Sequence, residues 1–159
     1  MARRRNNITA KQWFWRSREM LESPAWRTLS LSGRRALDRI TLELMSHAGN
    51  DNGRLPVRYE DFVGYGIDRH AVAPALREIE ALGFIEVTQR GRASAGKYRW
   101  PNYFRLTDRD SGNADPTNDW RRIKSIEEAQ AIARPARKDK RKAKRSKRHH
   151  RPPAMAVIS

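Results

Sequence analysis

The 159-residue sequence contains no cysteine. This excludes disulfide bonds, thiol nucleophiles and cysteine-based zinc sites, and it fits a protein of the reducing cytosol. No apolar run approaches the roughly 20 residues that a membrane-spanning helix needs. The N-terminus also lacks the continuous hydrophobic segment of a secretory signal. We therefore expect a cytoplasmic protein with no membrane partner.

Residues that could perform catalysis are not grouped by any motif. No motif places a serine nucleophile with His70 as its base. The acids Glu60 and Asp61 occupy an expected helix start, where the helix dipole favours them. The adjacent His149 and His150 could hold a metal only weakly, because nothing preorganises them. We predict a protein that is not an enzyme and that requires no cofactor and no metal.

Acidic residues are scarce at both ends of the chain, so the net charge of +16 is unevenly spread. Residues 1–17 carry +5 and residues 134–159 carry +10, whereas residues 18–107 sum to +3 and residues 108–133 to −2. Basic ends of this kind suit the phosphate backbone of a nucleic acid or an anionic membrane surface. The charge therefore predicts a polyanionic partner without saying which one.

Composition divides the chain into five predicted segments. A basic and aromatic arm over residues 1–17 precedes a folded domain over residues 18–107. A polar linker (residues 108–124) and a short helix (residues 125–134), capped by Ser125 and ending before Pro135, come next. The basic tail over residues 135–159 is expected to be disordered. Its candidate non-specific phosphate contacts are Lys138, Lys140, Arg141, Lys142, Lys144, Arg145, Lys147 and Arg148.

Three consecutive aromatic residues, Trp13, Phe14 and Trp15, stand next to the basic N-terminus. They could stack on single-stranded bases. Aromatic residues near a terminus more often pack onto their own domain or onto a dimer partner, and we favour that interpretation.

The first part of the folded domain shows two helix starts. Ser23 followed by Pro24 can cap a short helix that places Trp26 against the core. Ser32 is expected to cap a longer helix with apolar residues at helical spacing up to Ala48.

Residues 53–107 predict an ordered series of short elements. A strand containing Pro56, which belongs at a sheet edge, is followed by a helix over residues 59–65. Gly66 then suits the left-handed turn into a second helix over residues 68–83, capped by Asp68 and interrupted by Pro74. Strands over residues 84–89 and 98–106 complete the series, with Phe104 and Leu106 facing the core and Trp100 as a third candidate for that face. This order is typical of a winged helix-turn-helix, within an α+β fold that also has a preceding helical segment and disordered basic arms.

The helix over residues 68–83 is the expected recognition helix, since one helix fits the major groove of B-DNA, about 12 Å wide. Its residues outside the apolar stripe are the candidate DNA contacts. Arg69 and His70 lie in the first turn, where such helices reach base edges, and Arg77 is expected to contact phosphate. These outward positions are Arg69, His70, Ala73 and Arg77.

The segment GRASAGKY over residues 91–98 nearly matches a phosphate-binding P-loop. Tyr98 stands where a magnesium-binding hydroxyl is needed, and the following residues alternate like a strand instead of opening a helix. The segment is better explained as a wing, the loop between two strands that touches the DNA backbone or minor groove. The candidate wing contacts are Arg90, Arg92, Lys97 and Arg99.

Three segments, SPAWRTLS (23–30), GRLPVRYEDF (53–62) and PNYFRLT (101–107), carry a family resemblance together with ALRE and LGFI over residues 75–85. The pattern resembles winged helix-turn-helix proteins of bacterial, plasmid and phage origin, both regulator-like and replication-initiator-like. The resemblance covers a little over half of the chain and implies the fold more strongly than the function. The Lys-rich tail is similar to linker histones only in layout.

Three functional hypotheses follow, of which a DNA-binding transcriptional regulator, nucleoid-associated in the cytoplasm, is the first. It would read double-stranded DNA, as a monomer or a homodimer. A replication-initiator-like protein, or a sequence-independent nucleoid or RNA-associated protein, is the alternative. The third is an adaptor that uses the same fold for a protein partner.

Overall fold

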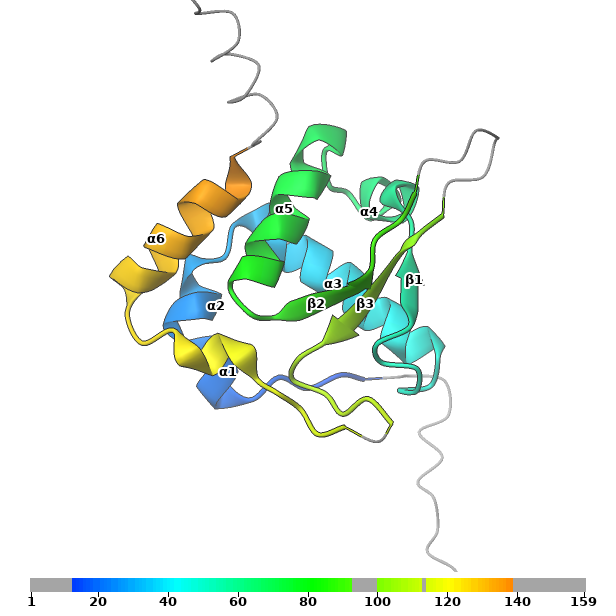
Figure 1. The fold of residues 1–159 in the computed structure, drawn as a ribbon, viewed down its shortest axis with the longest axis horizontal. Coiled ribbons are helices and arrows are strands. Elements are labelled where there is room, and N and C mark those ends of the chain that lie inside the picture. The colour runs from blue at the N-terminus through cyan, green and yellow to red at the C-terminus, as the bar shows by residue number, and fades with distance from the viewer. Residues whose placement is uncertain (1–12, 93–99, 113, 139–159) are drawn as a thin grey trace, which may run out of the picture.

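The computed structural model describes residues 13–92, 100–112 and 114–138, which form an α+β fold built on one hydrophobic core (Figure 1). The candidate wing residues Lys97 and Arg99, residues 1–12 of the arm and the tail beyond Lys138 lie outside these ranges. The described helices are α1 (Arg18–Glu22), α2 (Pro24–Thr28), α3 (Leu31–Ser46), α4 (Tyr59–Gly64), α5 (Arg69–Ala81) and α6 (Ile126–Arg137), with a 3₁₀ helix, η1, over Asp119–Arg122. The strands are β1 (Leu55–Val57), β2 (Ile85–Gln89) and β3 (Asn102–Leu106).

The three strands form an antiparallel sheet in the order β1-β3-β2. Pro56 lies opposite Tyr103 in the β1–β3 pair, on an edge strand as the sequence predicted, where its missing N–H interrupts no second ladder. Phe104 in the central strand is fully buried and makes an edge-on aromatic contact with Phe62 of α4, the ring centroids being 6.0 Å apart. The sheet is thus joined to α4 through its middle strand.

Helices α3, α4 and α5 pack against one another and against the sheet (Figure 1). The apolar stripe of α5 is buried as its spacing predicted, with Val72 and Ile79 fully buried. Pro74 lies inside the helix without ending it. The order α3-β1-α4-α5-β2-β3 with this sheet topology is compatible with a winged helix.

A serine side chain caps the N-terminus of each of the first three helices. The Oγ of Ser23 accepts a hydrogen bond from the N–H of Trp26, as predicted, and Trp26 packs edge-on against Phe84. The expectation that Ser32 caps α3 is wrong. Ser30 is the cap, its Oγ accepting from the N–H of Gly33 at 3.0 Å, and α3 begins one residue later.

The polar linker predicted over residues 108–124 is not separate from the domain. Trp120 in η1 and Ile123 after it are buried in the core. Gly83, at the end of α5, has φ +83°, and a Cβ placed there would lie 2.7 Å from the backbone of Asp119. The close packing of η1 on this glycine brings the chain back onto the domain.

Helix α6 continues three residues further than predicted, ending at Arg137. Pro135 was expected to stop it, but lies within its last turn, where only one intrahelical bond is lost. Packing compensates for this loss, because Ala129 and Ala133 are fully buried where α6 crosses α5 and α2. The predicted separate helix is therefore part of the domain.

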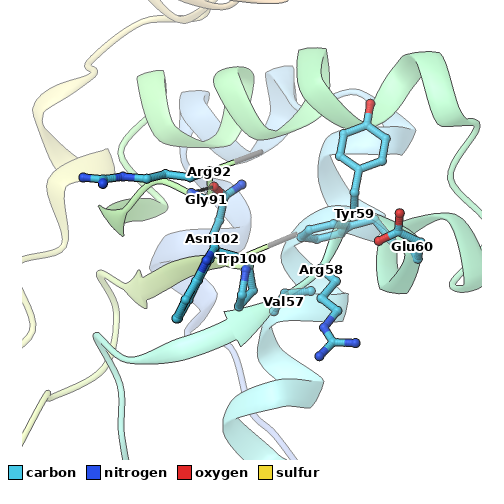
Figure 2. Close-up of a pocket in the computed structure, with 10 residues that line it drawn as sticks. Val57, Arg58, Tyr59, Glu60, Gly91, Arg92, Trp100 and Asn102 are labelled. Carbon is cyan, nitrogen blue, oxygen red and sulfur yellow. Dashed lines mark hydrogen bonds between the residues drawn. The ribbon is translucent and has the colours of Figure 1, made fainter. Parts of the chain in front are cut away.

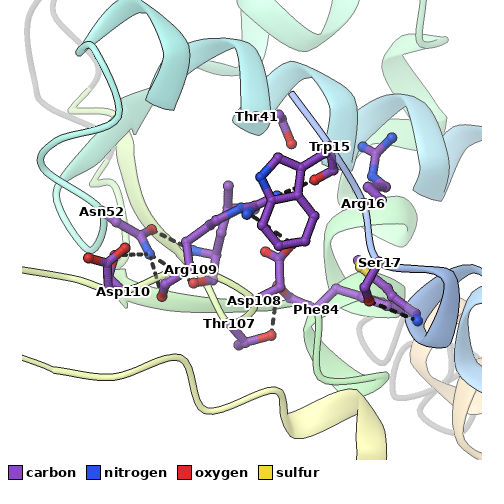
Figure 3. A network of polar contacts seen from close by, with 12 residues as sticks. Trp15, Arg16, Ser17, Thr41, Asn52, Phe84, Thr107, Asp108, Arg109 and Asp110 are labelled. Atoms are coloured by element: carbon purple, nitrogen blue, oxygen red, sulfur yellow. Dashed lines mark hydrogen bonds and ion pairs between the residues drawn. The ribbon is translucent and has the colours of Figure 1, made fainter. Parts of the chain in front are cut away.

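In the aromatic N-terminal segment, Phe14 packs against the core, as the interpretation favoured from sequence expected, whereas Trp13 and Trp15 are largely exposed. The Arg109 guanidinium lies over the rings of Phe14 and Trp15, 4.1 and 4.4 Å from their centroids. It also donates to the carbonyl of Trp15 (Figure 3). The nearby Asn52 side chain is buried and hydrogen bonds with the backbone of Leu106 and Arg109. This polar network ties Phe14, Trp15 and the end of β3 to the turn after α3.

Candidate nucleic-acid interface

The N-terminal end of α5 presents the exposed polar surface predicted from sequence. Gly66 adopts φ +96°, and Ile67 is buried, which fixes the turn from α4. Asp68 then caps α5, its carboxylate accepting from the N–H of His70 at 2.8 Å. Arg69 and His70 are both exposed. The fold therefore holds these two side chains on a fixed helix end, where anions are favoured.

Tyr59 orients this helix end from α4. Its hydroxyl donates to the carbonyl of Arg69 at 2.6 Å, and the Arg69 guanidinium lies 5.7 Å from the centre of the Tyr59 ring. The cation–π contact leaves the guanidinium exposed. Tyr59 therefore supports a residue expected to contact DNA, a role that the sequence did not reveal.

The other two α5 candidates differ from the prediction. Ala73 is half-buried. The Arg77 Nε donates to the carbonyl of Ala136 at 2.8 Å, and a terminal nitrogen of Arg77 donates to that of Arg137 at 3.2 Å. Arg77 thus caps the C-terminal end of α6, whose last carbonyls need partners. Because of this role, the structure does not support the expectation that Arg77 contacts phosphate.

A buried carboxylate next to Arg77 fastens α6 to the domain. Glu78 is only 1% exposed and accepts from the N–H and Oγ of Ser30 at 2.8 and 2.5 Å. Arg137 donates to the same carboxylate at 2.5 Å and to the carbonyl of Thr28 at 3.0 Å. Glu78 therefore connects α5, the cap of α3 and the end of α6.

The predicted wing begins at Arg90. Its guanidinium donates to both carboxylate oxygens of Glu80 at 3.1 Å, yet the side chain remains 70% exposed. Arg92 is exposed. Gly91 lies between them, and a Cβ there would come within 2.2 Å of the carbonyl oxygen of Trp100, so the strands can approach only with glycine. Both described wing arginines thus lie at the surface beside the sheet.

Helix α6 determines where the basic tail starts. It lies beside α5, and its C-terminal end points to the side of the molecule at which α5 begins (Figure 1). Lys138 follows α6 directly and is exposed. The other tail candidates lie beyond the described residues. The tail therefore starts on the same side as Arg69 and His70.

Within residues 13–92, 100–112 and 114–138, two titratable groups have perturbed pKa values, and neither lies at this surface. Burial raises the pKa of Asp108 above its ordinary value, an effect that the guanidinium of Arg109, 3.6 Å away, only partly offsets. A hydrogen bond with Asp51 raises the pKa of His47, burial opposes the rise, and Glu43 adds to it. Both groups belong to structural contacts around α3 and β3.

The described part of the chain offers neither a metal-binding cluster nor a membrane-spanning helix. Across residues 13–92, 100–112 and 114–138, no three His, Asp or Glu side chains are grouped so that they could hold a metal ion. No helix in this part of the chain has both the length and the apolar character needed to cross a bilayer. Compared with known proteins, the chain matches no family model, no curated protein and no solved structure.

Proposed function

We propose that this chain is a DNA-binding protein with a winged helix-turn-helix, in which α5 enters a major groove. The observation that carries the proposal is the capped, exposed N-terminal end of α5 bearing Arg69 and His70. Both side chains can donate hydrogen bonds to base edges, and an arginine can contact guanine in a bidentate manner. Arg90 and Arg92 would contact the backbone from the wing.

The basic tail adds affinity that does not depend on sequence. Because α6 ends on the side at which α5 begins, Lys138, the last described residue of the basic tail, lies on the side of the proposed DNA surface. Each phosphate that the tail neutralises steepens the dependence of log affinity on log salt by about 0.9. In this proposal α5 selects the site and the tail strengthens the complex. A transcriptional regulator is the first role proposed, and a replication-initiator-like protein is the alternative.

The proposal is tested by in vitro selection of bound duplexes, followed by anisotropy titrations of the selected site. We expect Arg69→Ala with His70→Ala to weaken binding to the selected site at least about 10-fold, since a good base contact is worth roughly 1–3 kcal/mol. Binding to unrelated duplex should change much less. Arg18→Ala is the matched control, because Arg18 is 89% exposed on α1 and pairs only with Glu22 among the described residues. Unchanged site affinity in the double variant would remove α5 from the interface.

Sequence-independent binding is the second candidate, favoured by the concentration of charge in the tail. Truncation after Lys138 separates the two functions, and it preserves α6, whose Arg137 contacts the buried Glu78. If the truncated protein keeps its site preference with a shallower salt slope, the first proposal stands. Loss of both affinity and preference would favour the nucleoid or RNA-associated function. Absence of any binding to DNA or RNA at low salt would favour a protein partner.

A further inference from the structure

Trp100 is left at the surface although it immediately precedes the central strand. Its side chain is 62% exposed, whereas Phe104 and Leu106 are at most 1% exposed. The prediction that Trp100 could share their core-facing side is therefore wrong. The strand begins only at Asn102, and Pro101 separates Trp100 from the alternating pattern. Burial within the described domain gives no reason for a tryptophan at this position.

A pocket of about 350 Å³ lies beside this tryptophan, between the start of α4 and the base of the predicted wing (Figure 2). The apolar part of its lining includes Val57, Phe62 and Pro101. Phe62 belongs to the core and is 1% exposed, so this wall is firmly held. The remaining lining residues are Arg58, Tyr59, Glu60, Gly91, Arg92, Trp100 and Asn102.

Two arginines give the pocket its charge. Arg58 and Arg92 are exposed, and neither has an acidic partner within 4.0 Å among the described residues. In Figure 2 the Arg92 and Arg58 guanidinium groups lie at opposite ends of the set of lining residues. Glu60 contributes one opposing charge. The pocket thus combines an exposed indole with two guanidinium groups that can reach phosphates.

Hydrogen bonds from two backbone N–H groups hold the base of the predicted wing in place. The N–H of Gly91 donates to Oδ1 of Asn102 at 2.7 Å, and the N–H of Trp100 donates to the carbonyl of Arg92 at 3.3 Å. Pro101 further restricts the chain after Trp100. Because a backbone hydrogen bond already holds Arg92 beside Trp100, these two residues need little further ordering when a ligand binds.

The pocket adjoins the proposed DNA surface. Tyr59 lines the pocket, and its hydroxyl donates to the carbonyl of Arg69 in the first turn of α5. A strand that passes the α5 end could therefore also reach Trp100. This continuity favours a nucleic-acid strand over an unrelated small molecule as the occupant.

We propose that this pocket accepts one unpaired nucleobase of a DNA strand, stacked on Trp100, with adjacent phosphates bound by Arg58 and Arg92. The inference rests on the proposed DNA-binding function and adds to it the preference for a strand with an unpaired base. Aromatic stacking is tolerant of base identity, since every base has a π-face. The pocket would therefore recognise an unpaired base without selecting its sequence.

The test compares the full-length protein and its variants on two labelled probes: a fully paired duplex, and the same duplex with one bulged thymidine. We expect Trp100→Ala to weaken binding to the bulged probe about 5- to 100-fold relative to its effect on the paired probe. Trp100→Phe should retain most of the preference, because it keeps an aromatic face. Trp13→Ala removes another exposed tryptophan, 63% accessible, and should change neither affinity appreciably.

Three results would overturn the pocket assignment: no effect of Trp100→Ala, an equal loss on both probes, or an equal loss in Trp13→Ala. The two proposals can fail separately. If the wild-type protein binds the paired duplex but shows no preference for the bulge, only the pocket proposal fails. If it does not bind the paired duplex at all, the major-groove proposal fails, and the bulged probe still decides whether Trp100 stacks on a base.

Discussion

Replacing Glu78 by glutamine should loosen α6 from the domain. The carboxylate accepts from two donors of Ser30 and one of Arg137, at 2.5 to 2.8 Å. A glutamine would have to direct its NH₂ group toward one of these donors. It would also remove the negative charge beside Arg137. Because the substitution preserves side-chain size, any loss of unfolding free energy comes from the changed hydrogen bonding and charge.

The magnitude follows from burial. Removing one partner of a buried ion pair costs roughly 3–5 kcal/mol. Glu78 is fully enclosed, but the Arg137 side chain is 36% exposed, so water relieves part of the penalty. We therefore expect Glu78→Gln to lower the free energy of unfolding by about 2–3 kcal/mol. Urea denaturation at neutral pH measures this loss. Hydrogen exchange over residues 126–137 should show that protection falls most in α6.

Glu80→Gln is the matched control on the same helix. Glu80 pairs with Arg90 at 3.1 Å, but Arg90 is 70% exposed, so the loss should stay below about 0.5 kcal/mol. Arg137→Gln completes a double-mutant cycle with Glu78→Gln. It should cost about 1–2 kcal/mol less in the Glu78→Gln background than in the wild type. A loss below about 0.5 kcal/mol for Glu78→Gln, or strict additivity in the cycle, would refute the reasoning.

Two further predictions concern backbone geometry and pH. Gly83→Ala should destabilise the protein by about 3 kcal/mol or more, because the added Cβ would lie 2.7 Å from backbone atoms and the residue is left-handed. Gly49→Ala, at φ +80° but with open space around it, should cost only about 1–2 kcal/mol. Equal urea midpoints for the two variants would contradict this reasoning. His47 has a raised pKa in the folded state, so its stabilisation is fully present below its ordinary pKa of 6.5 and is lost as pH rises through the folded value. His47→Gln should abolish this component of the pH dependence of urea unfolding, and an unchanged pH profile would show that His47 is not its source.

The elements of the domain were predictable because their signals are local. The apolar stripe of α5, the cap at Asp68 and the turn at Gly66 all lie within a few residues of the structure they specify. The edge position of Pro56 follows from its missing N–H. Patterns of this kind depend on spacing and backbone chemistry, which a sequence displays directly.

Contacts between distant residues were not predictable in the same way. Arg77 and its acceptor Ala136 are 59 residues apart, so outward spacing on the helix could not show that α6 covers Arg77. The charged residues around Trp120 made its segment appear to be a linker, although that tryptophan is buried. One signal was present: Ala129 and Ala133 are small residues at helical spacing, as expected where one helix crosses closely over another.

The candidate site was recovered only in part from sequence. Arg69 and His70 are exposed as predicted, because first-turn positions depend on the cap alone. The exposure of Trp100 was missed, since alternation placed it with Phe104 and gave no weight to Pro101 between them. Tyr59 was missed because its hydroxyl bonds a backbone carbonyl ten residues away.

The central claim, that the first turn of α5 lies in a DNA groove, can be measured directly because the chain has no cysteine. His70→Cys would carry a single iron-chelate cleavage reagent on that turn, and Arg18→Cys would carry the same reagent on α1. On a selected duplex, the account predicts strand cleavage confined to a few base pairs for His70→Cys and only background cleavage for Arg18→Cys. Equal or diffuse cleavage by the two conjugates, with the DNA bound, would contradict it.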